Sequence, residues 1–191
     1  MSILFINACV REHSRTLTLA RYCLAKMGGV VQELELQKEN IAPLNQTTLA
    51  LRERLLRENA LSHEAFCYAR DFAKAEEIVI AAPFWDLSFP SLLKTYLEAV
   101  TVSGITFHYL DNVPHGLCRA KRLIYITTAG GLIFADFGFS YVKTLAQNFY
   151  GIQAVTCFQA EGLDLEGANP QALLDAAKQR ILNSELLEKS M

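Results

Sequence analysis

Four short runs of apolar residues constrain the fold of this chain more than any other feature of its sequence. Patterns typical of amphipathic helices separate one run from the next. Short and almost wholly apolar runs are typical of strands that are buried on both faces of a parallel sheet. The four runs, which predict the centre of such a sheet, are Ile3 to Asn7, Ile78 to Ala82, Leu123 to Thr127 and Ala154 to Phe158.

A fifth stretch, Val30 to Leu36, alternates polar and apolar residues from Gln32 onward. Alternation of this kind indicates a strand that is half exposed, so we expect it at an edge of the sheet. Helical patterns fill the intervals between the strands. The longest of them, Thr47 to Ala75, is expected to hold two helices broken near Ser62. These patterns cover Ser14 to Met27, Thr47 to Ala75, Pro90 to Val102, Ala135 to Phe149 and Pro170 to Leu187.

Strands that alternate with helices predict a parallel sheet with helices on both faces and right-handed crossovers. Five strands favour a flavodoxin-like three-layer α/β sandwich with the strand order 2-1-3-4-5. The chain has 191 residues, of which 51% are hydrophobic, and this suits one domain over residues 1–191. We expect the segment Gly104 to Lys121 to be a long loop, a kind of connection that is often functional.

Composition excludes several classes of function. The net charge is −2, from 18 basic and 20 acidic residues, so nucleic-acid binding is not expected. No apolar run is long enough to cross a membrane, so we expect no membrane insertion. The five cysteines are scattered without a C-x-x-C pair, which indicates a cytoplasmic protein, and the four histidines lack the spacing of a metal site. Cys9 is either a reactive thiol or a small residue chosen for fit.

The loop after the first strand has the features of a phosphate site. Ser14 is a good N-cap, and the helix that it begins presents free N–H groups and a positive dipole end. The hydroxyls of Ser14 and Thr16 can donate to phosphate oxygens, and Arg11 and Arg15 can supply charge. Neither the G-x-x-x-x-G-K-[ST] motif nor the G-x-G-x-x-G motif is present, which disfavours ATP or GTP binding and the dinucleotide-binding fingerprint. The alternative is an ordinary capped helix with surface arginines.

Two further loops carry weaker signals. Pro83 to Phe89 places Phe84, Trp85 and Leu87 where a flat apolar ligand would cover them. Their alternative role is core packing or a dimer contact, and Asp86 suits a turn. The loop Thr127 to Gly131 ends in paired glycines, which let a backbone approach a ligand without an intervening side chain, or form a plain turn.

In the order 2-1-3-4-5 these three loops follow adjacent strands at the point where the strand order reverses, the usual place for a ligand. A phosphate cradle, an aromatic platform and a glycine wall in one crevice fit a flat ring on a phosphorylated tail. That description matches flavin mononucleotide (FMN).

Three motifs give the chain a resemblance to a known family. They are APFWDLSFPSLLKTYLE with the following GITFHY, then ITTAGG, then FYGI with FQAEG. With them the chain resembles the FMN-dependent NADH:quinone oxidoreductases and azoreductases. The resemblance implies a homodimer that works by a ping-pong route. NAD(P)H reduces FMN and leaves, and a quinone or an azo or other aromatic acceptor is then reduced in the same pocket.

The resemblance also implies site residues. Tyr109 would lie over the open face of the flavin as a candidate proton source, and Phe149 would reach the pocket from the partner subunit. No metal site is implied. The implied cofactor-binding residues are Ser14, Arg15 and Thr16 at the phosphate, Pro83, Phe84, Trp85, Asp86 and Leu87 at the ring, and Thr128, Ala129, Gly130 and Gly131 at its pyrimidine side.

The chain departs from the family pattern at three of these positions. Asp86 replaces the usual Asn, Leu87 the usual Phe and Ala129 the usual Arg. These departures leave open a cofactor-less binding protein of the same fold. A flavodoxin-type electron carrier is a further alternative, although the near-neutral charge disfavours it. A quinone reductase that uses FAD also remains open.

Overall fold

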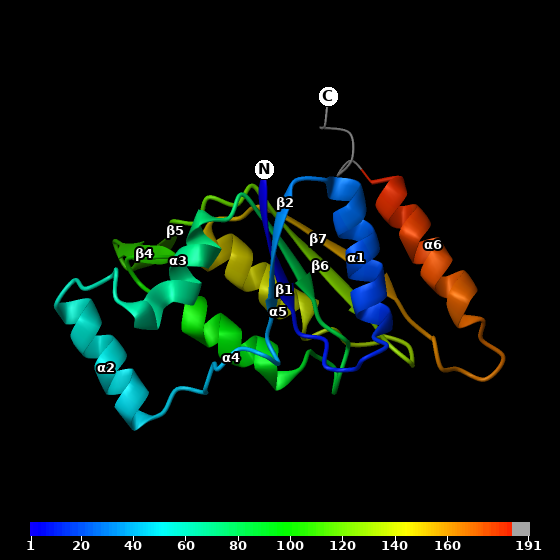
Figure 1. Cartoon of the computed structure of the whole chain (residues 1–191), viewed down its shortest axis with the longest axis horizontal. Coiled ribbons are helices and arrows are strands. Elements are labelled where there is room, and N and C mark those ends of the chain that lie inside the picture. Colours follow the sequence, from blue (N-terminus) through cyan, green and yellow to red (C-terminus); the bar gives the residue numbers. More distant parts are fainter. Residues whose placement is uncertain (185–191) are drawn as a thin grey trace.

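The computed structural model describes residues 1–184 and shows a five-stranded parallel sheet (Figure 1). The strand order is β2-β1-β3-β6-β7, which is the predicted order 2-1-3-4-5 once the two strands of a separate hairpin are left out. The prediction of a flavodoxin-like sandwich is therefore confirmed. The five strands are β1 (Ser2–Asn7), β2 (Val30–Glu35), β3 (Glu77–Ala81), β6 (Arg122–Thr128) and β7 (Ala154–Ala160).

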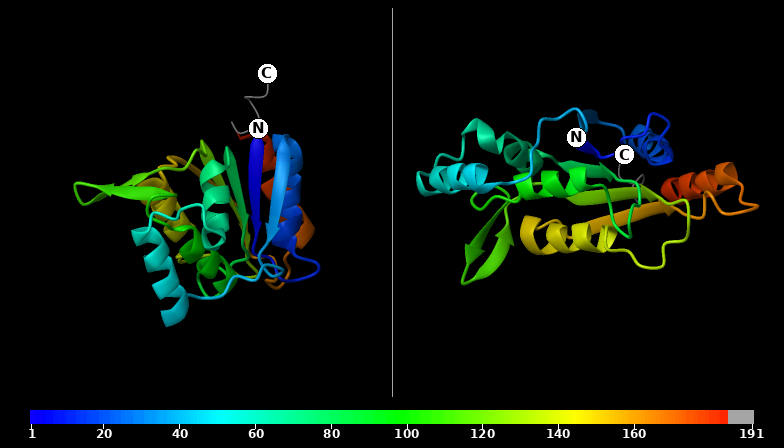
Figure 2. Two further views of the ribbon diagram at one scale, coloured as in Figure 1. Left: turned by 60° about the vertical axis from the view of Figure 1, so that its left-hand side comes forward. Right: turned by 90° about the horizontal axis from the view of Figure 1, so that it is seen from below.

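Helices cover both faces of the sheet and make three layers (Figure 2). Alternate residues of the central strands enter two separate cores, since successive side chains of a strand point to opposite faces. Ile78 and Ile80 pack toward one core, and Val79 packs toward the other. Helices α1 (Arg15–Met27) and α6 (Pro170–Leu182) cover the face of Val79. The opposite face is covered by α3 (Cys67–Lys74), α4 (Ser91–Val100) and α5 (Phe139–Leu145).

The edge position of β2 is confirmed. The strand pairs with β1 along one side only, and Val30 and Val31 are exposed. Helix α6 ends at Leu182, five residues before the expected end at Leu187, which itself lies outside the described residues. No helix within residues 1–184 is long and apolar enough to cross a membrane.

The segment expected to hold two helices does so. Helix α2 (Gln46–Arg57) begins at Asn45, whose side chain accepts from the N–H groups of Thr47 and Thr48. A 3₁₀ turn, η1 (Glu64–Phe66), leads into α3. Helix α2 buries only Leu55 and projects away from the sheet (Figure 1).

The expectation of a loop over Gly104 to Lys121 is wrong. Strands β4 (Phe107–Leu110) and β5 (Val113–Gly116) form an antiparallel hairpin there. Its turn is Asp111-Asn112, with φ angles of 51° and 63°. Two successive positive φ angles define the tight turn that suits a two-residue hairpin, and Asp and Asn tolerate them.

The helix expected to begin at Ala135 begins at Phe139 instead. The Oδ1 atom of Asp136 accepts from the N–H groups of Gly138 and Phe139, each at 2.8 Å, so the chain from Asp136 to Gly138 forms a turn before the helix. The helix continues as a π-helical turn, η2 (Ala146–Tyr150), and ends at Gly151, whose φ of 79° suits a glycine.

Candidate functional site

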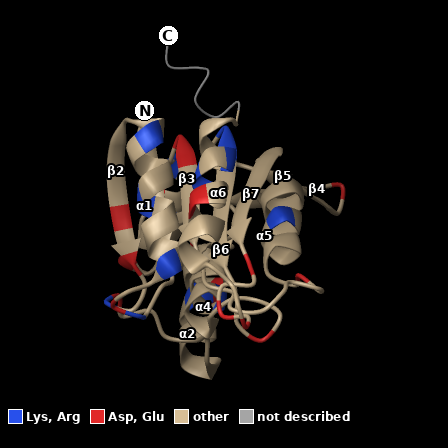
Figure 3. Ribbon diagram, turned by 90° about the vertical axis from the view of Figure 1, so that its right-hand side faces the viewer, with Lys and Arg blue, Asp and Glu red and all other residues tan. Residues whose placement is uncertain are grey.

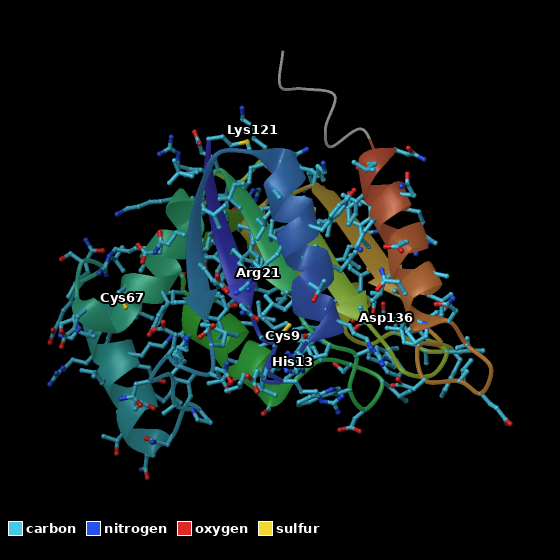
Figure 4. All side chains as sticks on the ribbon, turned by 45° about the vertical axis from the view of Figure 1, so that its right-hand side comes forward. Cys9, His13, Arg21, Cys67, Lys121 and Asp136 are labelled. Atoms are coloured by element: carbon cyan, nitrogen blue, oxygen red, sulfur yellow. The ribbon has the colours of Figure 1, made fainter. Side chains whose placement is uncertain are left out.

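A cavity of about 310 Å³ lies where the loops after β1, β3 and β6 meet at the carboxyl end of the sheet. Figure 4 labels Cys9 and His13 in the first of these loops. The structure thus brings the three expected loops together. The cavity is lined by Val10, Arg11, His13, Ser14, Arg15, Thr16, Pro83, Phe84, Trp85, Thr128, Ala129, Gly130, Leu163 and Asp164.

The first loop presents the N-terminus of α1 to this cavity. The hydroxyl oxygen of Ser14 accepts from the N–H of Leu17 at 3.2 Å, which caps the helix and leaves the hydroxyl proton available to donate. The N–H groups of Arg15 and Thr16 have no acceptor within the helix, because the first turn of a helix lacks them. The start of α1, with these two N–H groups and the positive end of the helix dipole, lines the cavity, where it favours an anion.

A buried side-chain contact joins the first loop to the third. The hydroxyl oxygens of Thr16 and Thr128 lie 2.6 Å apart, and both residues are buried. Thr128 is the last residue of β6, so the contact ties the start of α1 to the end of that strand. Buried hydroxyls are expected to be paired, and here the pairing sets the distance between two walls of the cavity.

The second loop contains a tight two-residue turn. The N–H of Trp85 donates to the carbonyl of Ser88 at 3.1 Å, and the reverse bond measures 2.7 Å. Between them Asp86 and Leu87 have φ angles of 48° and 65°. Asp tolerates this conformation, but for Leu it is strained. Asp86 is therefore a turn former, as the alternative interpretation proposed.

The turn decides which residues of the second loop face the cavity. Pro83, Phe84 and Trp85 line it, whereas Asp86 and Leu87 do not. Asp86 is exposed. The carbonyl of Leu87 accepts from the N–H of Phe137 at 3.0 Å, so the strained turn is held from outside. Backbone strain of this kind persists where the surroundings over-determine the conformation, and it gathers at functional sites.

A fourth segment, 162–164, completes the cavity, and sequence reasoning missed it. Its backbone lies along the third loop through hydrogen bonds from Leu163 to Ala129 at 3.2 Å and from Asp164 to Gly130 at 2.9 Å. Leu163 is 2% exposed and packs in the core beneath α1 and α6. The available signal was the carboxyl end of the strand that begins at Ala154, because such ends gather at one edge of a parallel sheet.

The two glycines of the third loop play different parts. A Cβ atom at Gly130 would collide with the carboxylate of Asp164, so the missing side chain makes room for Asp164. A Cβ atom at Gly131 would meet open space, and Gly131 does not line the cavity. The expected reason for Gly130, a direct approach of ligand to backbone, is therefore incomplete, since the nearest group is a side chain of the chain itself.

Charges of both signs surround the carboxyl end of the sheet (Figure 3). Arg11, His13 and Arg15 line the cavity together with one carboxylate, that of Asp164. A nitrogen of Arg15, Nη1, lies 2.6 Å from Oδ1 of Asp164. The two charged groups that reach across the cavity from α1 and from the 162–164 segment therefore pair with one another.

Cys9 belongs to the first loop and is 2% exposed. Burial raises the pKa of its thiol from 9.0 to about 11. Its N–H donates to the side-chain oxygen of Asn7 at 3.0 Å, and the amide of Asn7 donates to Glu33 at 2.9 Å. A neutral, buried thiol supports the interpretation of Cys9 as a small residue chosen for fit.

Tyr109 and Phe149 do not line the cavity of their own chain. Tyr109 lies on β4 and is 58% exposed. Phe149 lies on η2, and the ring of Phe107 packs between the two at centroid distances of 5.4 and 5.1 Å. The hairpin projects from one side of the molecule, away from the loops after β1 and β6 (Figures 1 and 2).

A family model described as "Flavodoxin-like fold" matches residues 1–184. A relative from Clostridium acetobutylicum named "FMN-dependent NADH:quinone oxidoreductase 2" is 34% identical over 185 residues, covering 90% of this chain and 92% of the relative. An "FMN-dependent NADH:quinone oxidoreductase" from Coprothermobacter proteolyticus is 31% identical, covering 93% of this chain and 94% of the relative.

Solved structures agree with the fold. An azoreductase from Bacillus anthracis superimposes with a TM-score of 0.83 at 22% identity, covering 94% of this chain and 96% of that one. An FMN-dependent NADH-azoreductase from the same species, solved in complex with FMN, gives a TM-score of 0.80 at 20% identity, covering 95% and 96% of the two chains. At these identities the likeness concerns the fold alone.

Proposed function

The chain belongs to the flavodoxin-like family that includes the FMN-dependent NADH:quinone oxidoreductases, and from that premise we propose that its cavity binds FMN and passes hydride from NADH to quinones and azo compounds. The chain is an enzyme, and its cofactor is FMN. One observation carries the assignment of the site. The N-terminus of α1 and the aromatic pair Phe84-Trp85 line the same cavity, so one space offers an anion site and an apolar platform.

The residues present fit a phosphorylated flat ring. The phosphate would be held by the N–H groups of Arg15 and Thr16, by the hydroxyl of Ser14 and by the helix dipole. Phe84 and Trp85 would give the ring an apolar surface, and Ala129 with Gly130 would form the opposite wall. An open cavity at this place supports a bound cofactor over the cofactor-less alternative.

When bound, FMN supplies the redox chemistry, because its ring accepts and gives up hydride. The chain's own residues bind, orient and shield it. Hydride transfer needs no catalytic acid or nucleophile from the protein. Trp85 and Phe84 would exclude water from one side of the ring, and the paired hydroxyls of Thr16 and Thr128 join the first and third loops. NADH and the acceptor would use the same open side in turn, which is the ping-pong route.

We further propose that Tyr109 and Phe149 serve the cavity of a second copy of the chain. Tyr109 is 58% exposed on a projecting hairpin, and an exposed aromatic side chain at such a position suits a protein contact. Phe149 lines an apolar groove of about 460 Å³ between α2 and helices α4 and α5. A homodimer would cover both and bring two aromatic rings to the partner's flavin.

The free cysteines support a cytoplasmic location.

The visible spectrum of the purified protein tests the function. A flavin spectrum that bleaches when NADH is added without oxygen, and returns when menadione follows, is the expected result. Bleaching by NADH without re-oxidation by menadione contradicts the quinone reductase and favours a carrier. A colourless protein that takes up no FMN on reconstitution contradicts the proposal altogether.

A further inference from the structure

We propose that the ion pair between Arg15 and Asp164 closes one end of the cavity and makes this chain select FMN over flavin adenine dinucleotide (FAD). The inference rests on the proposed function, because it concerns which flavin the same cavity accepts. Both flavins share the ring, the ribityl chain and the first phosphate. FAD then continues through a second phosphate to adenosine, so a barrier beyond the first phosphate would distinguish the two.

Asp164 is positioned by its backbone and not by its exposed side chain. Its N–H donates to the carbonyl of Gly130 at 2.9 Å, and its neighbour Leu163 is anchored in the core. A Cβ atom at Gly130 would collide with the Asp164 carboxylate, so that carboxylate already lies against the third loop. The carboxylate therefore cannot move back on that side to admit a larger ligand.

The other end of the barrier is equally well held. Arg15 is the first residue of α1, between the N-cap Ser14 and the buried Thr16, whose hydroxyl contacts that of Thr128. The guanidinium of Arg15 reaches Asp164 at 2.6 Å, and both residues line the cavity. The pair thus connects two firmly positioned segments that are 149 residues apart in the sequence.

Stability does not account for the pair. The side chains of Arg15 and Asp164 are 40% and 61% exposed, and ion pairs at such exposed positions contribute little to folding. Removing the Asp164 carboxylate is therefore expected to leave the chain folded. We therefore expect the loss of this carboxylate to change which ligand the cavity binds.

The charges of the barrier favour a ligand with one phosphate. The N-terminus of α1 attracts that phosphate through its free N–H groups and its dipole. A second phosphate attached to the first would share the cavity with the carboxylate of Asp164, which repels it, and the charge of Arg15 is already balanced by Asp164. At about 310 Å³ the cavity also lies at the lower end of the range of roughly 300–1,000 Å³ seen for ligand sites.

Titration of the apoprotein with FMN and with FAD, followed by flavin fluorescence, tests the inference. The wild type is expected to prefer FMN. Asp164→Ala is expected to reduce the dissociation constant for FAD, divided by that for FMN, by about tenfold, or about 1.4 kcal/mol. The change should come mainly from tighter FAD binding. Asp164→Asn, which keeps the size and removes the charge, should reduce the ratio less. The control is Asp175→Ala, which removes the carboxylate of another exposed ion pair, with Lys178 on α6.

The outcomes separate the two proposals. Equal binding of both flavins by the wild type overturns the inference and leaves the proposed function standing. So does an Asp164→Ala variant that binds FMN and keeps the wild-type ratio of the two dissociation constants. A fall in the ratio that also occurs in Asp175→Ala is an unspecific effect of charge and overturns it too. A wild-type chain that binds neither flavin contradicts the proposed function and, with it, the inference.

Discussion

The hydroxyl oxygens of Thr16 and Thr128 lie 2.6 Å apart in the protein interior and connect the first helix to the end of strand β6. Each residue belongs to a segment that lines the cavity. The contact therefore links folding to function, because one buried hydrogen bond joins two walls of the cavity.

Replacing Thr16 by Val keeps the shape of the side chain and removes its hydroxyl. The buried hydroxyl of Thr128 then loses its partner, so the free energy of unfolding should fall by about 1–3 kcal/mol, as measured by urea denaturation of the apoprotein. FMN binding should weaken as well. Thr144→Val, which removes an exposed hydroxyl bonded to the carbonyl of Ser140 on α5, is the control and should change neither quantity. Equal effects in the two variants would contradict the role of the Thr16–Thr128 contact.

Replacing Leu87 by Gly should stabilise the protein. Leu87 has a φ of 65° in the tight turn, and a non-glycine residue there costs about 1–2 kcal/mol. Glycine removes that cost but also loses the contacts of a partly buried side chain, so the expected net gain is below about 1 kcal/mol in urea denaturation. Leu132→Gly is the matched control, because Leu132 is exposed and is not among the residues with positive φ. A free energy of unfolding that is lower for Leu87→Gly than for the wild type would contradict the prediction.

The buried thiol of Cys9 should make stability depend on alkaline pH. Its pKa is raised from 9.0 to about 11 by burial, so the folded state holds the proton more firmly than the unfolded state. The resulting stabilisation is fully present below pH 9.0 and is lost as the pH rises to about 11. Cys9→Ala should therefore show a shallower fall of the free energy of unfolding over this interval. Cys67→Ala, at a more exposed cysteine, serves as the control, and identical slopes for Cys9→Ala and the wild type would refute the prediction.

Mixing two variants, each of which is expected to lose activity by itself, tests whether Tyr109 serves the partner's cavity. In a mixed dimer of Tyr109→Ala and Trp85→Ala chains, one cavity would combine an intact Trp85 with an intact Tyr109 from the other chain, and the second would lack both. Equal mixing should give about a quarter of the wild-type activity, since half of the dimers are mixed and each has one intact cavity. If Tyr109 acts on its own chain, every cavity carries a defect and no activity returns.

The order of the sheet could be predicted because it depends on local patterns. Each central strand is a short apolar run, and the rules for parallel sheets arrange such runs in few ways. The hairpin Phe107 to Gly116 was missed although its turn, Asp111-Asn112, is a readable signal. Its strands are only four residues each, too short for alternation to distinguish them from a loop.

The site was only partly predictable for a different reason. The capped helix at Ser14 and the aromatic loop at Trp85 are local features, and both line the cavity. Asp164 is different, since its contact with Arg15 depends on how α1 packs against the end of β7. No pattern within either segment signals a partner 149 residues away. The turn at Asp86 and Leu87 belongs to the same class, because its strain becomes visible only in the backbone angles.

Fluorescence of Trp85 during titration with FMN tests the central claim most directly. Trp85 is the only tryptophan of the chain and lines the cavity, so its emission reports on that one place. We predict that one FMN per chain quenches this emission and that the flavin fluorescence is lost at the same stoichiometry. Uptake of FMN that leaves the Trp85 emission unchanged, or no uptake at all, would contradict the account.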